Sequence, residues 1–253
     1  MRSYASIGNA MSGAKRFFVE KVEEITTLCG DEFEHAKNVL RLGEGDEVIL
    51  LDNSGMEYTA VIAKCEKRQM LLSLIGKKEG EREATEEIAL FFGYLKNADK
   101  NEFIVQKAVE LGVKKIVAFS SDYSSAYMNA NKLERLNKVS KEAAKQCLRS
   151  VAPQVEYAES FSKALDLADG YTNKLFACEF ATESEASLSV LKGSSALVVG
   201  SEGGFSRAEA TAAKEKGFAL INLGKRILRA ETAAVALTAV VAFSLGELGG
   251  VAK

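Results

Sequence analysis

A glycine-rich segment, residues 200–206, is the first place in this sequence where residue types and spacing suggest ligand binding. It reads Gly-Ser-Glu-Gly-Gly-Phe-Ser and follows the apolar run 196–199, which has the composition of a buried strand. Glycines at a strand end allow the backbone to approach a ligand closely or to adopt positive φ. Ser206 and Glu209 have the spacing of a capping box, which predicts that a helix begins there. The segment matches neither a dinucleotide fingerprint nor a phosphate loop, and a tight turn without a ligand is the alternative interpretation.

A second polar segment, residues 222–232, follows the next expected strand and precedes the apolar stretch 233–245. It places three cations beside Glu231 at the start of an expected helix, where the helix dipole favours an acidic side chain. Open α/β sheets bind ligands at the carboxyl ends of their strands, so two such loops at successive strand ends predict a ligand site. The apolar helix itself is expected to lie in the core or in a subunit interface.

A basic stripe marks the expected helix over residues 131–149. On a wheel of about 100° per residue its cations share one arc, opposite an apolar arc. The stripe consists of Arg135, Lys138, Lys141, Lys145 and Arg149. Such a stripe is typical of a track for phosphates, and a solvated helix face explains the spacing equally well.

Composition excludes several other classes of function. The chain has 33 basic and 35 acidic residues, one histidine and four cysteines without a CxxC pair, so neither a metal site nor a disulfide framework is expected. The cysteines are expected to be reduced in a cytoplasmic protein. The longest nearly apolar stretch, 233–245, is shorter than the roughly 18 residues that a membrane span needs, and no signal peptide is expected. His35 is expected to be a surface or RNA-facing side chain rather than a catalyst.

The elements that position these segments form two expected domains. We expect a small barrel over residues 1–80, built from short strands at 17–19, 47–51, 58–65 and 69–75 with a helical turn at 35–42. Residues 1–14 are expected to be a flexible extension, or else Met11 is an alternative start. The polar run 77–87 is expected to be the boundary. Residues 86–253 alternate strands with helices, which predicts a parallel sheet covered on both faces. The expected strands are 88–94, 116–120, 175–178, 196–200 and 219–223, and the expected helices are 99–111, 131–149, 161–169, 206–217 and one from 230.

Six segments in this order resemble the 16S ribosomal RNA uridine-N3 methyltransferases, the RsmE family of the SPOUT superfamily. The resemblance covers about residues 15–249, and the last two segments are the most specific. The segments are 16–18, 35–41, 102–112, 142–149, 200–206 and 223–233.

The resemblance implies an N-terminal PUA-like β-barrel that binds RNA and a C-terminal α/β SPOUT domain tied in a deep trefoil knot. It implies a homodimer, S-adenosylmethionine as cofactor, and a uridine near the 3′ end of 16S rRNA as the target, either in free rRNA or in the assembled small subunit. Neither a membrane nor a metal is expected. The cofactor is expected to contact Gly200, Glu202, Gly203, Gly204, Leu223, Gly224, Ile227, Leu228 and Thr232. The RNA is expected to contact Arg16, His35, Arg41, Lys138, Lys141, Lys145 and Arg149.

Methylation at N3 requires removal of a proton, by a general base or with help from a cation that stabilises the uridinate. Glu231 or Glu202 is expected to be the base and Arg229 the stabilising cation. The chain departs from the family pattern at four places: Ser201 replaces proline, Ala230 replaces threonine, Asp122-Tyr123 replaces a Glu-Arg pair, and Leu148 replaces a small residue. Ribose 2′-O methylation and a non-catalytic role in ribosome assembly are the alternative functions.

Overall fold

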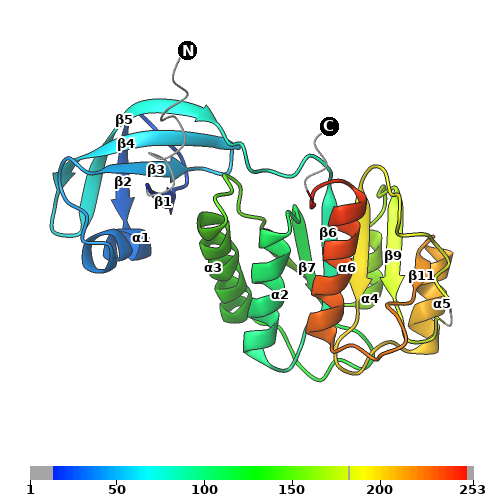
Figure 1. Ribbon diagram of the computed structural model, residues 1–253. Coiled ribbons are helices and arrows are strands. Elements are labelled where there is room, and N and C mark those ends of the chain that lie inside the picture. The colour runs from blue at the N-terminus through cyan, green and yellow to red at the C-terminus, as the bar shows by residue number, and fades with distance from the viewer. Residues whose placement is uncertain (1–13, 182, 250–253) are drawn as a thin grey trace, which may run out of the picture. The chain divides into compact units, whose positions relative to one another are not determined.

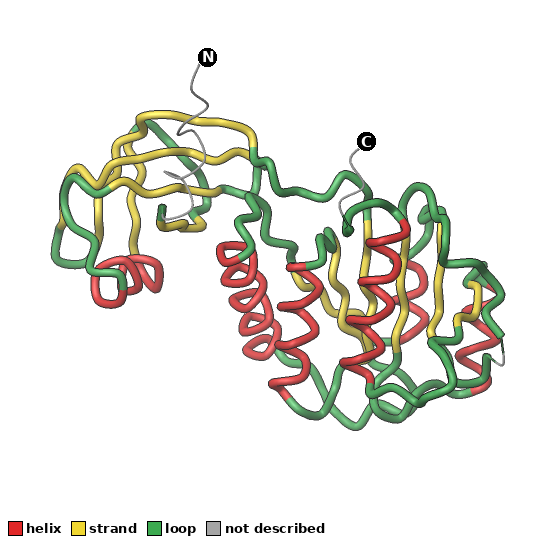
Figure 2. The backbone as a smooth tube through the Cα atoms, viewed as in Figure 1, coloured by secondary structure: helices red, strands yellow, loops and turns green. Residues whose placement is uncertain are grey.

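The computed structural model describes residues 14–181 and 183–249, which fall into two compact units (Figures 1 and 2). The first unit comprises the chain up to Glu83 together with Leu148–Val151, and the second comprises Ala84–Cys147 and the chain from Ala152. The short stretch 148–151, expected in the second domain, thus belongs to the first unit. The expected extension 1–14 and the choice of start lie, apart from Ala14, outside the described residues.

The first unit is built on one five-stranded sheet with the order β1-β3-β4-β5-β2. Its strands are β1 (Lys15–Phe18), β2 (Ile25–Cys29), β3 (Glu47–Leu51), β4 (Met56–Cys65) and β5 (Gln69–Glu79). β1 pairs with β3 in parallel, and the other neighbours are antiparallel. Alternating apolar residues on the strands supply a common core that includes Phe17, Leu28, Leu50 and Leu72. β1 and β2 form the two edges of the sheet.

Three details of the first unit differ from expectation. Strand β2 was not expected, because its Thr-Thr pair interrupts an otherwise short apolar run. The helical turn expected at 35–42 is present as the π-helical segment η1 (His35–Val39), and a short helix, α1 (Gly30–Glu34), precedes it. The polar run 77–87 is only partly a connection, since β5 extends through Glu79 in a long pairing with β4.

The second unit is a six-stranded, fully parallel sheet with the order β11-β9-β10-β6-β7-β8. This is the parallel α/β arrangement that the alternating sequence pattern predicts. The strands are β6 (Ile88–Gly93), β7 (Lys115–Phe119), β8 (Val155–Ala158), β9 (Asn173–Ala177), β10 (Ser195–Val199) and β11 (Ala219–Ile221). The helices are α2 (Ala98–Glu110), α3 (Ala130–Gln146), α4 (Phe161–Asp166), α5 (Arg207–Glu215) and α6 (Ala230–Ser244).

Helices cover both faces of this sheet, with α2, α3 and α6 on one face and α4 and α5 on the other (Figure 1). On the α4–α5 face, four phenylalanines pack together, namely Phe119, Phe161, Phe176 and Phe205. Strand β8 was not expected, because its sequence Val-Glu-Tyr-Ala is short and half polar. Among the described residues, no helix is long and apolar enough to cross a membrane.

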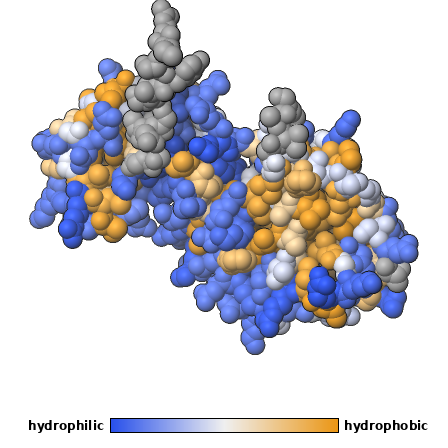
Figure 3. All heavy atoms as spheres, viewed as in Figure 1, coloured by the Kyte–Doolittle hydropathy of each residue, from blue (hydrophilic) through white to orange (hydrophobic). Residues whose placement is uncertain are grey.

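Helix α6 is apolar on its outer side as well as on the side that faces the sheet. Leu237 and Val241 are buried, whereas Val240 and Phe243 are exposed, Phe243 at 64%. Apolar side chains accordingly form a continuous patch on this face of the second unit (Figure 3). An exposed apolar helix face of this kind is typical of an interaction surface.

Candidate active site

A cavity of about 680 Å³ lies at the carboxyl ends of β9, β10 and β11. Its volume is within the range of about 300–1,000 Å³ that small-molecule sites usually have. The cavity is lined by three chain segments at the ends of these strands and by one lysine and one alanine from helices. They are residues 177–179, 199–205 and 221–231, with Lys100 and Ala233.

The glycine-rich loop is held rigidly between the sheet and α5. Phe205 is buried and its ring lies 4.3 Å from the ring of Phe176, measured between centroids. Ser206 accepts a hydrogen bond from the backbone of Glu209, whose carboxylate accepts one from the backbone of Ser206, and this capping box starts α5. Gly204 has a φ of +66°. The backbone of residues 200–204 is therefore presented to the cavity in one fixed shape.

The loop that carries the Asp122-Tyr123 departure packs against this glycine loop. A Cβ atom added to Gly203 would lie 2.7 Å from the Cβ of Tyr123, so only glycine fits there. Asp122 accepts a hydrogen bond from the hydroxyl of Ser206, and its own backbone N–H donates to Glu209. Hydrogen bonds with Asp122 therefore stabilise the first turn of α5.

Glu231, in the first turn of α6, carries the most unusual carboxylate of the cavity. Its Oε1 lies 2.9 Å from the ammonium of Lys100, whereas its Oε2 is buried and has no hydrogen-bond partner among the described residues. Burial alone would raise the pKa of Glu231. Hydrogen bonds from Lys100 and from its own backbone N–H, with the charges of Lys100 and Arg229, outweigh burial and hold that pKa below its ordinary value of 4.5.

Glu202, the other candidate base, is more exposed. Its Oε1 accepts a hydrogen bond of 3.3 Å from the backbone N–H of Lys96. Arg229 is exposed and forms the N-cap residue of α6, without a side-chain cap hydrogen bond. The cavity thus combines a shaped backbone surface with three carboxylates and four cations, namely Glu179, Glu202, Glu231, Lys100, Lys225, Arg226 and Arg229.

Comparison with known proteins assigns the chain. A family model described as an RNA methyltransferase domain matches residues 81–242, and one described as an RNA methyltransferase PUA domain matches residues 28–75. The Ribosomal RNA small subunit methyltransferase E of Bacillus subtilis is 31% identical, over 93% of this chain and 99% of the relative. The chain belongs to this methyltransferase E family. The protein of the same name from Mesomycoplasma hyopneumoniae is 30% identical, over 88% and 96% of the two chains.

Solved structures agree with this membership. The methyltransferase E of Neisseria gonorrhoeae, bound to S-adenosylmethionine, superimposes with a TM-score of 0.81 at 28% identity, over 92% of this chain and 98% of that one. A Legionella pneumophila protein in complex with the same cofactor gives 0.83 at 25% identity, over 90% and 96%. The family that the sequence motifs indicated is therefore confirmed.

The structure brings together the residues expected to bind the cofactor of this methyltransferase E member, with one exception. Gly200, Glu202, Gly203, Gly204, Leu223, Gly224, Ile227 and Leu228 all line the cavity. Thr232 does not line it and is exposed, because α6 has already begun and turns that side chain away. Sequence reasoning missed Lys100, for which no local signal exists, and the segment 177–179, which the rule about carboxyl strand ends could have found.

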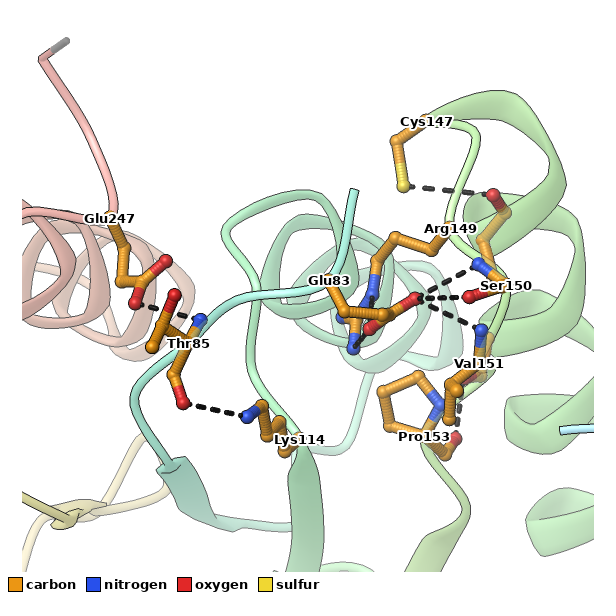
Figure 4. A network of polar contacts seen from close by, with 11 residues as sticks. Glu83, Thr85, Lys114, Cys147, Arg149, Ser150, Val151, Pro153 and Glu247 are labelled. Carbon is orange, nitrogen blue, oxygen red and sulfur yellow. Dashed lines mark hydrogen bonds and ion pairs between the residues drawn. The ribbon is translucent and has the colours of Figure 1, made fainter. Parts of the chain in front are cut away.

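Arg149, expected on the basic stripe, is instead buried in the first unit, so that prediction is wrong. Helix α3 ends at Gln146, and Leu148 has a φ of +64°, which turns the chain away from the helical path. The Arg149 guanidinium donates to Glu83 Oε2 from Nε and Nη2, at 3.0 and 2.9 Å (Figure 4). The remaining oxygen of Glu83 accepts from the backbone N–H groups of Ser150 and Val151.

The other members of the stripe differ in exposure. Lys145 has a side chain only 8% exposed and pairs with Glu142. Arg135 pairs with Glu102. Lys138 is exposed and lies 3.4 Å from Glu134, and Lys141 is exposed. Lys138 and Lys141 are therefore the two stripe residues best placed to meet a phosphate.

The RNA contacts expected on the first unit divide in the same way. Arg16 has a mostly buried guanidinium that forms a 3.0 Å ion pair with the buried Glu57 through Nη2, while its Nε and Nη1 have no hydrogen-bond partner among the described residues. Its contact with RNA stays a prediction. His35 is half-buried and its ring packs edge-on against Phe17. Arg41 is exposed and has a φ of +57°. Among the described residues, no cluster of His, Cys, Asp or Glu could hold a metal ion.

Proposed function

We propose that this protein methylates N3 of one uridine near the 3′ end of 16S rRNA, using S-adenosylmethionine. The observation that carries the proposal is the cavity at the ends of β9, β10 and β11, built from two glycine-bearing loops in a chain of the methyltransferase E family. The relatives' name implies the small ribosomal subunit as the substrate.

The residues that line the cavity fit this cofactor. Backbone groups of residues 200–204 and 223–228 surround an opening whose walls include Val199, Ile221 and Leu228, which suits a nucleoside with a polar tail. Glu179 and Glu202 supply carboxylates that suit its positive charge. When bound, the cofactor supplies an electrophilic methyl group on a sulfonium centre.

Glu231 is the better candidate for the base. Its Oε2 has no hydrogen-bond partner among the described residues and so has unused capacity to accept a hydrogen, while Lys100 holds the other oxygen. In the proposed step Glu231 takes the N3 proton, and the N3 electron pair forms the bond to the methyl carbon as the bond from that carbon to sulfur breaks. Arg229 stabilises the negative charge that develops on the uracil ring. A Watson–Crick pair would occupy N3, so the target base must be unpaired or flipped out.

Two features of the family enter as part of the proposal. Contacts between Asn222 and the β9–β10 connection, at Ala181 and Ser184, support a trefoil knot in which residues 222–230 thread that connection. An experimental structure in which this segment lies outside the connection would contradict the knot. The exposed apolar side of α6, with Val240 and Phe243, supports a homodimer, and sedimentation that finds only monomer at micromolar concentration would contradict it.

The RNA is proposed to contact surfaces of both units. Lys138 and Lys141 on α3 and Arg41 in the first unit are the exposed cations that support this part of the proposal. A ribosomal substrate also fits a cytoplasmic location.

The test is methyl transfer to deproteinised 16S rRNA and to assembled small subunits, followed by nucleoside analysis. The proposal expects N3-methyluridine at one position, and ribose-methylated nucleosides or no transfer would overturn it in favour of the two alternative functions. Calorimetry should find one S-adenosylmethionine site per subunit in the wild type. A Gly203→Val variant should lose that binding, because its side chain would collide with Tyr123 and displace the loop.

A further inference from the structure

We infer that Lys100 is a positioning residue that orients Glu231 for proton abstraction, and that the chain segment 95–101 is the frame that holds it. This inference rests on the proposed function of Glu231. It concerns a residue outside the two glycine-bearing loops, on a different helix from Glu231.

The frame is rigid because one buried asparagine ties it together. Asn101 is 1% exposed. Its side-chain oxygen accepts from the backbone N–H of Leu95, and its side-chain nitrogen donates to the carbonyl oxygens of Leu95 and Asn97, all at 2.8–2.9 Å. Asn97 in turn caps α2 by accepting from the backbone N–H of Asp99. The side-chain amide of Asn101 therefore forms hydrogen bonds with the backbone groups of the turn that leads from β6 into α2.

The frame contacts both candidate bases, Glu202 and Glu231. Lys100 stands in the first turn of α2 and contacts Glu231 at 2.9 Å, and the backbone N–H of Lys96 contacts Glu202 at 3.3 Å. The side chains of Lys100 and Glu231 are 26% and 16% exposed, so their pair is partly shielded from water and stronger than a surface pair. One short segment thus sets the position of both candidate bases.

Lys100 uses only one oxygen of Glu231, which leaves Oε2 without a donor in the described residues. A purely structural ion pair in a partly buried place usually satisfies both oxygens. The single contact holds the carboxylate through Oε1 and leaves the buried Oε2 without a donor among the described residues. In the proposed function this oxygen pairs with the N3–H group of uridine once the side chains around it move to admit the base.

Lys100 also controls the charge of Glu231. Burial, which raises the pKa of Glu231, is opposed by Lys100 and more weakly by Arg229 and the backbone. The other charged side chains that line the cavity are Glu179, Glu202, Lys225 and Arg226. Removal of the Lys100 charge should therefore raise the pKa of Glu231.

The inference is tested by NMR titration of the Glu231 carboxyl carbon in the full-length protein without RNA. The pKa of Glu231 should be higher in Lys100→Met than in the wild type, and close to the wild type in Lys100→Arg. Lys174→Met is the matched control, since Lys174 is similarly shielded at 17% exposed, pairs with Asp169 and lies at the amino end of β9, away from the cavity.

Single-turnover methylation of small subunits gives the second readout. Lys100→Met should slow the step about 10- to 100-fold at neutral pH, with its acidic limb moved to higher pH, while Lys174→Met behaves as the wild type. An unchanged Glu231 titration in Lys100→Met, or no rescue by arginine in either readout, would overturn the inference. Absence of methylation by the wild type would instead overturn the proposed function, and the titration would still decide whether Lys100 controls Glu231.

Discussion

Glu83 in the first unit and Glu231 in the cavity are both carboxylates paired with a cation, and they differ in how completely they are satisfied. Both oxygens of Glu83 accept hydrogen bonds, from Arg149 on one side and from two backbone N–H groups on the other (Figure 4). Glu231 has one lysine contact, and its Oε2 has no donor among the residues that the structure describes. Both oxygens of Glu83 are hydrogen-bonded, whereas only one oxygen of Glu231 has a donor among the described residues.

The difference separates a structural role from a chemical one. A saturated carboxylate has no capacity left for a ligand, and its loss would leave Arg149 buried without its partner carboxylate. A buried carboxylate oxygen without a hydrogen bond lowers the stability of the folded protein unless a ligand or substrate donates to it. The number of hydrogen-bonded oxygens therefore distinguishes the two roles, whereas the presence of an ion pair does not.

The largest expected effect on stability comes from Glu83→Ala. It would leave the buried Arg149 guanidinium without its carboxylate, which should lower the free energy of unfolding by about 3–5 kcal/mol. Urea denaturation followed by circular dichroism measures this change. Glu81→Ala is the control, because Glu81 is exposed and forms its ion pair with the half-exposed Lys78, so its effect should be small. Equal effects of the two substitutions would show that the Glu83 cluster is not a structural anchor.

Neutralising Lys138 and Lys141 tests whether exposed cations bind RNA. Both lysines are exposed, whereas Arg149 is buried and paired with Glu83. Each lost phosphate contact should reduce the slope of log affinity for RNA against log salt by roughly 0.7–0.9. Fluorescence anisotropy with labelled RNA at several salt concentrations measures the slope. Cofactor binding should not change, since neither residue lines the cavity. An unaltered slope would identify the stripe as a solvated helix face.

A smaller effect is expected from Glu231 on acid stability. Because its pKa is lowered in the folded protein, its ionisation contributes stability above the ordinary value of 4.5. That contribution is lost as the pH falls through the lower folded-state pKa. The difference in free energy of unfolding between wild type and Glu231→Gln should therefore change as the pH falls from about 6 to about 3, as followed by urea denaturation. A difference that is constant over this range would show that Glu231 has an ordinary pKa.

Local patterns predicted most of the fold and of the cofactor cavity. The parallel α/β unit and the glycine-bearing loops each depend on residues close together in the chain, such as Ser206 and Glu209 at the start of α5. Lys100 could not be predicted, because its partner is 131 residues further along the chain and only the packing of α2 against α6 joins them. Arg149 was placed wrongly because a wheel cannot show that the helix ends at Gln146. Strands β2 and β8 were missed because both are short and partly polar.

The most direct test of the account is single-turnover methylation of assembled small subunits by Glu231→Gln and Glu202→Gln at saturating cofactor and RNA. Glutamine keeps the size of each side chain and removes its ability to accept a proton. We expect Glu231→Gln to slow formation of N3-methyluridine about 10²- to 10⁴-fold, and Glu202→Gln to have a much smaller effect. A Glu231→Gln enzyme that methylates uridine as fast as the wild type would contradict this expectation.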